Sequence, residues 1–255
     1  MPGARILVKD TLRKLTRRLG YEVINMNRPG ASSAVPAGFD LETTATYARV
    51  RPFTMTSAER IGALVEATRY IIRAGIPGGI VECGVWKGGS MMAVALTLAN
   101  ARNADRDLYL FDTYEGMTKP TAVDGQHART TWSERQTASH NTWAYAGLKE
   151  VRTNIASTGY PTDRVHYIVG KVEETVPSSA PDSIAILRLD TDWYESTKHE
   201  LEHLFPRLSK GGVLIIDDYG TYPGARKAVD EYISDRRLSL FLNRIDADAR
   251  LAIKL

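Results

Sequence analysis

Two apolar segments in the second half of the chain end in pairs of carboxylates, and these acids are the residues whose type and spacing most clearly indicate chemistry. Both segments are typical of buried strands. The acids at their ends are Asp190 and Asp192 after the first segment, and Asp217 and Asp218 after the second. In an open parallel sheet, ligands bind beyond the carboxyl ends of the strands. Because crowded carboxylates repel one another unless a cation or a proton lies between them, the pattern predicts a divalent cation site, with Mg²⁺ the first choice.

A glycine-rich turn in the first half of the chain predicts a second, nucleotide-type site. It begins at Glu82 and contains Gly84, Gly88 and Gly89, which permit close approach of a ligand to the backbone. Its spacing is G-x-x-x-G-G rather than the G-x-G-x-x-G of dinucleotide sites, so a pyrophosphate cradle is not specified. Glu82 would attract an ammonium, and Asp112, which ends the next strand-like run, is placed to bind both hydroxyls of a ribose. An ammonium and a ribose together indicate S-adenosylmethionine.

The elements that must position these residues alternate between helix and strand patterns. Capping-box spacing from Thr56 to Glu59, followed by an apolar stripe to Ile72, predicts a helix. Strands are expected at 79–83, 108–112, 165–169, 184–190, 213–217, 238–244 and 251–254, and further helices at 90–101, 141–157, 196–208 and 223–236. The alternation predicts an α/β fold with a doubly wound, mostly parallel, seven-stranded Rossmann-like sheet. The last two strands break the alternation and predict an antiparallel C-terminal hairpin.

Residues 1–50 differ from the rest and are expected to form an N-terminal helical extension, with the main domain at 51–255. Apolar residues recur at near-helical spacing between Ile6 and Leu19, and a Pro/Gly/Ser/Ala stretch follows. The helix could cover the active site, or its basic side could touch a membrane surface. Because the apolar stripe is narrow, packing or contact within a homo-oligomer is the preferred interpretation.

The composition limits the classes of partner. The chain has 255 residues, of which 43% are hydrophobic and 25% charged, and its net charge of +3 requires no polyanionic partner, so nucleic-acid binding is not expected. No apolar run approaches the roughly 18 to 20 residues that span a bilayer, and the N-terminus lacks a signal-type apolar core. The single cysteine, Cys83, lies in an apolar strand pattern, which agrees with a reducing compartment. A cytoplasmic protein without membrane contact is therefore expected.

Five segments, in order, resemble the successive motifs of the macrocin O-methyltransferase family, which includes the mycinamicin and novobiocin sugar methyltransferases. They are Glu-Cys-Gly-Val-Trp-Lys-Gly-Gly at 82–89, Phe-Asp-Thr-Tyr-Glu-Gly at 111–116, Leu-Arg-Leu-Asp-Thr-Asp-Trp-Tyr at 187–194, Pro-Arg-Leu-Ser-Lys-Gly-Gly at 206–212 and Ile-Ile-Asp-Asp-Tyr at 215–219. The similar region runs from about Thr54 to the end of the chain. The resemblance implies a class I methyltransferase fold, S-adenosylmethionine as methyl donor, Mg²⁺ or another divalent cation such as Ca²⁺, and a deoxysugar hydroxyl of a glycosylated small molecule as acceptor.

The resemblance also assigns roles to individual positions. Asp190, Asp217 and Asp218 match the metal ligands, and Asp192 matches the general base. The segment 54–56 resembles the part of the family that closes over the cofactor. The expected cofactor-binding residues are Thr54, Met55, Glu82, Gly84, Gly88, Ser90, Asp112 and Tyr114. The sequence departs most from the family at 118–143, where a variable lid that orders on substrate binding is expected, and the roles there of His127, His140, Trp132 and Trp143 stay open.

The chemistry of methyl transfer agrees with these assignments. An alcohol has a pKa closer to that of bulk water, about 15.7, than to neutrality, so activation by a cation and a base such as Asp192 is expected. A phenol or catechol methyltransferase is an alternative, because a phenol with a pKa of about 10 needs less activation. A nucleic-acid-binding protein, suggested by the basic N-terminal helix, and a nicotinamide dehydrogenase, disfavoured by the glycine spacing, are two further alternatives.

Overall fold

A seven-stranded sheet organises the part of the chain that the computed structural model describes, residues 36 and 38–255. The strands are β1 (Gly79–Cys83), β2 (Leu108–Asp112), β3 (Val165–Val169), β4 (Ile184–Leu189), β5 (Leu208–Ile216), β6 (Asn243–Arg244) and β7 (Arg250–Ile253). Their order is β3-β2-β1-β4-β5-β7-β6, and only the pairings of β7 with β5 and with β6 are antiparallel. The predicted fold class is therefore confirmed.

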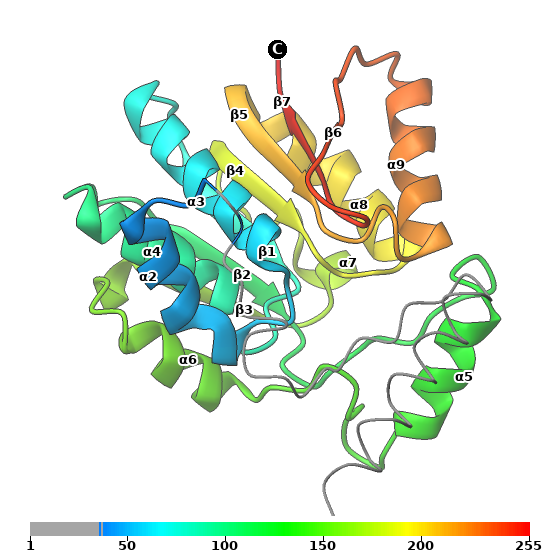
Figure 1. Ribbon diagram of the computed structural model, residues 1–255. Coiled ribbons are helices and arrows are strands. Elements are labelled where there is room, and N and C mark those ends of the chain that lie inside the picture. Colours follow the sequence, from blue (N-terminus) through cyan, green and yellow to red (C-terminus); the bar gives the residue numbers. More distant parts are fainter. Residues whose placement is uncertain (1–35, 37) are drawn as a thin grey trace, which may run out of the picture. The chain divides into compact units, whose positions relative to one another are not determined.

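The helices form two layers, one on each face of this sheet (Figure 1). One layer contains α3 (Ala58–Arg73), α4 (Gly89–Asn100) and α6 (Leu148–Ala156), and the other contains α7 (Val172–Thr175), α8 (Tyr194–Leu204) and α9 (Pro223–Asp235). Because both faces are covered, the central strand β4 is buried along its whole length, as parallel strands usually are. Short 3-10 turns lie at Arg51–Phe53, Thr162–Arg164 and Phe205–Arg207. No helix of the described residues has the length and apolar character needed to cross a membrane.

The compact unit that contains the sheet begins at Phe39. It includes helix α2 (Leu41–Val50), which contacts α3 and α4, so these ten residues pack with the main domain although the sequence suggested a boundary after residue 50. The helix expected between Ile6 and Leu19 lies outside the described residues.

The segment expected to form a lid, 118–143, contains helix α5 (Gln126–Arg135), which lies apart from both helical layers in Figure 1. The predicted helix at 141–157 begins only at Leu148. Asn141, at the start of the expected helix, instead stabilises the lid, because its side-chain amide donates to the carbonyl of Trp132 over 2.9 Å. The strand expected at 238–244 is reduced to its last two residues, where it pairs with β7.

The register of the central strands decides where the chemistry lies. Cys83 of β1 pairs with Leu189 of β4, and Leu189 pairs with Ile216 of β5, so the three strands end at the same level. The next residues along each strand are therefore neighbours: the amide of Asp190 donates to the carbonyl of Cys83 over 2.8 Å, and the amide of Asp217 donates to that of Leu189 over 2.9 Å. The glycine turn and the two acidic pairs thus meet at one edge of the sheet.

Candidate active site

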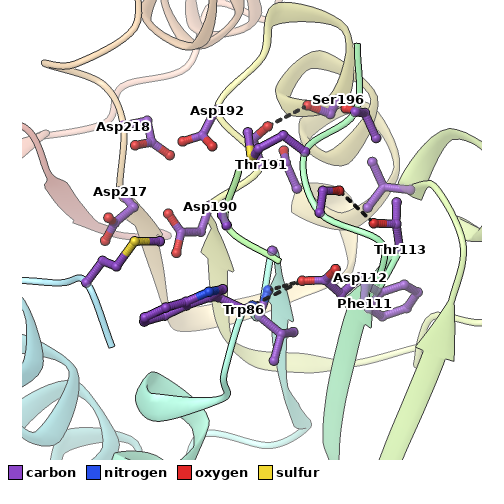
Figure 2. A pocket seen from close by; sticks show the side chains of 18 of the residues that line it. Trp86, Phe111, Asp112, Thr113, Asp190, Thr191, Asp192, Ser196, Asp217 and Asp218 are labelled. Carbon is purple, nitrogen blue, oxygen red and sulfur yellow. Dashed lines mark hydrogen bonds between the residues drawn. The ribbon is translucent and has the colours of Figure 1, made fainter. Parts of the chain in front are cut away.

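Three of the four predicted acids form one group at this edge. Carboxylate oxygens of Asp190, Asp192 and Asp218 all lie within 4.8 Å of one another. Figure 2 shows the carboxyl groups of Asp192 and Asp218 facing each other, with Asp190 beside them. The left-handed backbone of Asp192, with φ of 69°, turns the chain directly after β4 and brings its side chain back toward the end of β5.

Asp217 is directed to two arginines instead of into this group. Its Oδ1 accepts a hydrogen bond from Arg188 over 2.6 Å, and its Oδ2 accepts one from Arg60 over 2.5 Å. Consecutive residues at the end of a strand point to opposite sides, which separates Asp217 from Asp218. The group of three acids therefore contains Asp192, which was expected as the base, and does not contain Asp217, which was expected as a cation ligand.

Burial and mutual repulsion change the acidity of this group. Burial, together with the negative charges of Asp190 and Asp217, raises the pKa of Asp192 to about 8. Burial and neighbouring carboxylates also raise the pKa values of Asp190 and Asp218 well above their usual range. The Oδ2 atom of Asp218 is buried and has no hydrogen-bond partner among the described residues. Three carboxylates with an unpaired buried oxygen are a donor set that fits a hard divalent cation.

The glycine turn after β1 lies directly against these acids. Gly84 has a φ of 85°, and a Cβ atom there would overlap the carbonyl oxygen of Asp190. Gly89 begins α4, and a Cβ atom there would lie 2.5 Å from the carbonyl oxygen of Phe53. Only glycine fits at either position, so the turn brings bare backbone close both to the acids and to the segment that precedes α3.

Asp112, at the end of β2, holds this turn in place. Its carboxylate accepts hydrogen bonds from the amides of Val85, Trp86 and Tyr114 over 2.7, 3.1 and 2.7 Å, and Figure 2 shows the contact with the Trp86 backbone. Burial raises the pKa of Asp112, although the three amides oppose this effect. Each carboxylate oxygen has two lone pairs, so Asp112 can hold the turn and still accept from a ligand hydroxyl.

A cavity of about 270 Å³ joins the two halves of the site. This volume is close to the lower end of the range for small-molecule pockets, which is roughly 300 to 1,000 Å³. The predicted residues that line it are Thr54, Met55, Gly84, Ser90, Asp112, Asp190, Asp192, Asp217 and Asp218. The cofactor and cation residues named from the sequence therefore share one cavity, with three exceptions.

The exceptions are Glu82, Gly88 and Tyr114, none of which lines the cavity. Glu82 is 1% exposed and accepts a hydrogen bond from Arg188, and burial raises its pKa to about 7. Gly88 provides the left-handed residue before α4. Tyr114 is buried, and its hydroxyl donates to the carbonyl of Leu110 over 3.1 Å. All three support the walls of the cavity from behind.

Aromatic side chains form another wall. Trp143 and Tyr222 line the cavity, and both contact the buried ring of Trp193 edge to face, with centroids 5.7 and 5.1 Å away. The two lid histidines and Trp132 do not line it: His127 is exposed on α5, His140 lies against Tyr145, and the indole of Trp132 donates to the carbonyl of Met117. Of the four lid residues considered from the sequence, Trp143 alone lines the cavity.

The two arginines at this edge were missed by the sequence analysis. Arg188 lies on β4 with its side chain 4% exposed, and Arg60 lies on α3 with its side chain 13% exposed. A charged residue inside an otherwise apolar strand was the signal for Arg188, because such a residue is buried only with partners of opposite charge. Arg60 follows an ordinary helix pattern and carried no signal of its own.

The strand order, the glycine turn, the acid at the end of β2 and the cavity above them define a class I methyltransferase. Comparison with known proteins gives the family. The sequence pattern described as Macrocin-O-methyltransferase (TylF) matches residues 8–252, and the chain belongs to this family.

Individual relatives agree with this assignment. The chain is 35% identical over 193 residues to the 8-demethyl-8-(2,3-dimethoxy-alpha-L-rhamnosyl)-tetracenomycin-C 4'-O-methyltransferase of Streptomyces olivaceus, covering 76% of this chain and 72% of the relative. It is 32% identical over 197 residues to the demethyldecarbamoylnovobiocin O-methyltransferase of Streptomyces niveus, covering 76% and 73%. The solved structure of the O-methyltransferase NovP superposes with a TM-score of 0.72 at 29% identity, covering 79% of this chain and 82% of that one.

The protein is therefore an S-adenosylmethionine-dependent O-methyltransferase, as the sequence predicted. The family assignment excludes the two alternatives from other classes, a nicotinamide dehydrogenase and a non-catalytic nucleic-acid-binding protein.

Proposed function

We propose that this enzyme methylates a hydroxyl of a rhamnose-like deoxysugar on a glycosylated natural product, and that it requires a divalent cation, with Mg²⁺ the first choice. The name of the Streptomyces olivaceus relative, which specifies a rhamnosyl 4'-oxygen, supports the acceptor class. The observation that carries the cation requirement is that Asp190, Asp192 and Asp218 gather in the same cavity as the glycine turn and Asp112.

The cofactor fits the half of the cavity nearest β1 and β2. Gly84 and Gly89 leave the backbone bare there, and Asp112 retains acceptor capacity for one ribose hydroxyl. Thr54 and Met55 line the same region from the segment before α3. When bound, S-adenosylmethionine supplies an electrophilic methyl group, so the chain's own task is to align an acceptor oxygen and to remove its proton.

The acids are proposed to remove the proton of the acceptor hydroxyl. Asp190 and Asp218 are proposed to hold the cation, which when bound lowers the pKa of the acceptor hydroxyl. Asp192 is proposed to accept the hydroxyl proton, because its carboxyl group lies beside Asp190 and Asp218 in the cavity that the acceptor would enter (Figure 2). Asp217, the third ligand suggested by the family resemblance, would have to share oxygens that already accept from Arg60 and Arg188.

The aromatic wall is proposed to receive the sugar. Trp143 and Tyr222 line the same cavity as the acids, and both pack against Trp193, whose indole is held by donating to the carbonyl of Thr118 over 2.9 Å. Rings held in this way can pack against the apolar side of a deoxysugar while the acids meet its hydroxyls. The expected homo-oligomer stays a prediction.

A methyl-transfer assay tests the acceptor and the cation together. Purified protein is incubated with labelled S-adenosylmethionine and a panel of rhamnosyl glycosides, with catechol and simple phenols as the competing acceptors. We expect transfer to a glycoside, complete loss of transfer in excess EDTA and recovery with Mg²⁺. Transfer to phenols alone would replace the proposed acceptor class, and full activity in EDTA would remove the cation from the proposal.

The methyl-transfer assay, combined with calorimetric titration of Mg²⁺, distinguishes whether Asp192 acts as a base or as a cation ligand. Asp192→Asn is expected to lower kcat by about 10² to 10⁴, the usual contribution of a general base, while Mg²⁺ affinity measured by calorimetry changes little. Asp217→Asn serves as the comparison. The family resemblance gives Asp217 as a cation ligand, whereas in the structure its carboxylate binds Arg60 and Arg188. If Asp192→Asn loses Mg²⁺ affinity and Asp217→Asn does not, Asp192 is a ligand and the base assignment is wrong.

A further inference from the structure

Arg188 is a cation buried under the acidic edge of the sheet. It lies on β4 two residues before Asp190, and its side chain is 4% exposed. A guanidinium at this depth is costly unless hydrogen-bond acceptors and opposite charges surround it. The hydrogen-bond partners of Arg188 therefore indicate its role.

Those partners come from four separate segments. One terminal nitrogen, Nη1, donates to Oε1 of Glu82 and to Oδ2 of Asp190, each over 2.6 Å. The other, Nη2, donates to Oδ1 of Asp217 over 2.6 Å and to the hydroxyl of Thr56 over 3.2 Å. The donors of a guanidinium lie in one rigid plane, so a single side chain fixes the orientation of all four acceptors.

On the acidic side, Arg188 determines how the carboxylates face the cavity. It occupies one oxygen of Asp190 and leaves the other free to bind a ligand. Its positive charge also opposes the repulsion among Glu82, Asp190 and Asp217, which would otherwise drive these side chains apart.

On the cofactor side, the same guanidinium reaches the wall of the cavity. Thr56 belongs to the segment 53–56, every residue of which lines the cavity beside the glycine turn. The sequence suggested Thr56 as the residue that caps α3, but the cap is Ser57, whose hydroxyl accepts from the amide of Arg60 over 3.2 Å. The hydroxyl of Thr56 is therefore available to Arg188.

We propose that Arg188 is a positioning residue that couples the two halves of the active site. It orients Asp190 and Asp217 on the acidic side and, through Thr56, steadies the segment that walls the cofactor cavity. Cation and cofactor then bind cooperatively, because each ligand orders groups that the other also needs. This inference rests on the proposed function, since it assumes that the acids hold a divalent cation.

Calorimetric titration of S-adenosylhomocysteine and of Mg²⁺, each with and without the other, tests the coupling. In the wild-type enzyme each ligand is expected to tighten the other about fivefold or more, the lower end of ordinary coupling between sites. Thr56→Val keeps the shape of the side chain but removes the acceptor for Arg188. We expect this variant to lose most of the coupling, which is the ratio of the affinities for one ligand measured with and without the other and so does not require unchanged affinity for each ligand alone.

Arg188→Lys tests the positioning of the acids. One ammonium cannot reach acceptors on four segments, so the Kd of Mg²⁺ is expected to rise about tenfold or more, with a smaller change for S-adenosylhomocysteine. Arg69→Lys is the matched control, since Arg69 also donates to three carboxylates, those of Asp40, Glu42 and Glu66, but does not line the cavity. The control is expected to lose thermal stability without a change in either Kd.

The outcomes are distinguishable. If Thr56→Val and Arg188→Lys retain wild-type coupling and Mg²⁺ affinity, the inference is overturned while the proposed function stands. If the wild-type enzyme binds neither Mg²⁺ nor Ca²⁺, the cation requirement fails and the inference fails with it. If Arg188→Lys does not fold, the coupling measured for Thr56→Val decides alone.

Discussion

At the scale of single residues, the site depends on backbone conformations that residues other than glycine rarely adopt. Trp86, Tyr114 and Asp192 have φ angles of 45°, 56° and 69°, and they follow β1, β2 and β4 respectively. Non-glycine residues in this left-handed region are uncommon and are kept there only by surrounding contacts. For Trp86 and Tyr114 the contact is the carboxylate of Asp112, which accepts from both amides. One acid therefore stabilises the conformations of both Trp86 and Tyr114.

These conformations explain what the sequence could not predict about the acids. The strand pattern located all four aspartates at one edge of the sheet, because an apolar run that ends in a carboxylate is easily recognised. Whether Asp192 or Asp217 joins Asp190 and Asp218 depends on the left-handed turn at Asp192 and on two arginines distant in the chain. The turn has no local signature, and although a charge inside the apolar strand signals that Arg188 is paired, the local sequence does not tell which acids the two arginines bind.

Gly84 provides a residue-scale prediction. Gly84→Ala places a methyl group where the carbonyl of Asp190 lies, whereas Gly159→Ala has a similar φ of 79° and meets no atom within 4 Å. The control variant is expected to lose about 1 to 2 kcal/mol of unfolding free energy from backbone strain alone. Gly84→Ala should lose more in urea unfolding, and its kcat should fall by about 10², because the acids are displaced. Equal losses for the two variants would contradict the close packing of the turn on the acids.

At the scale of elements, β1, β2 and β3 lie where the sequence predicts them, because each is a short apolar run bounded by glycine, acid or helix signals. The lid was less predictable. Trp143 and Tyr145 suit a helix pattern, but Asn141 uses its side chain to bond Trp132 and Gln136, and α6 starts only after Gly147. Side-chain hydrogen bonds across a loop compete with helix formation and are not visible as periodicity.

Asp124 connects this lid to the acidic edge. It is 2% exposed, and its carboxylate accepts from the amide of Tyr194 at the start of α8 over 2.7 Å and from the amide of Thr121 over 2.6 Å. The carboxylate thus caps α8, which follows Asp192 directly, from another segment of the chain. Together with the indole of Trp193, which donates to the carbonyl of Thr118, this carboxylate connects the lid to the turn that carries the proposed base.

Asp124→Ala is therefore expected to change acceptor binding as well as stability. The variant should lose about 1 to 3 kcal/mol of unfolding free energy, since buried donors lose their partner. Its KM for the acceptor should rise roughly tenfold, equivalent to about 1.4 kcal/mol, because the lid loses one of its attachments to the acidic edge. Asp40→Ala, which removes the cap of α2 outside the cavity, is the control and should lower stability without changing KM. Unchanged KM for Asp124→Ala would show that the lid is positioned by other contacts.

At the scale of the whole domain, Arg60 links helix α3 to the C-terminal hairpin of β6 and β7. It donates to Asp217 at the end of β5, to Asp246 over 2.7 Å and to Asp248 over 2.6 Å. The hydroxyl of Ser57 also donates to Asp246, over 2.8 Å. The hairpin thereby contacts the start of α3, next to the segment that walls the cofactor cavity.

This connection predicts a specific pH dependence of stability. Burial alone would raise the pKa of Asp246, but hydrogen bonds from the Ala249 amide, Arg60 and Ser57 outweigh it and hold the pKa at about 2, against 3.8 for an aspartate free in water. A pKa lowered by folding contributes stability that is fully present above pH 3.8 and is lost as the pH falls toward 2. Asp246→Asn is thus expected to be less stable than wild type at pH 7, and the difference should shrink below about pH 4.

Urea unfolding of both proteins between pH 3 and pH 7 measures this difference. Asp235→Asn is the control, because Asp235 is the last residue of α9 and is exposed, and its substitution should leave both stability and its pH dependence nearly unchanged. If the difference in unfolding free energy between wild type and Asp246→Asn stayed constant down to pH 3, folding would not lower the pKa of Asp246. The stability lost in Asp246→Asn would then not depend on the charge of the carboxylate, and the ion pair of Asp246 with Arg60 would contribute little to the stability of the domain.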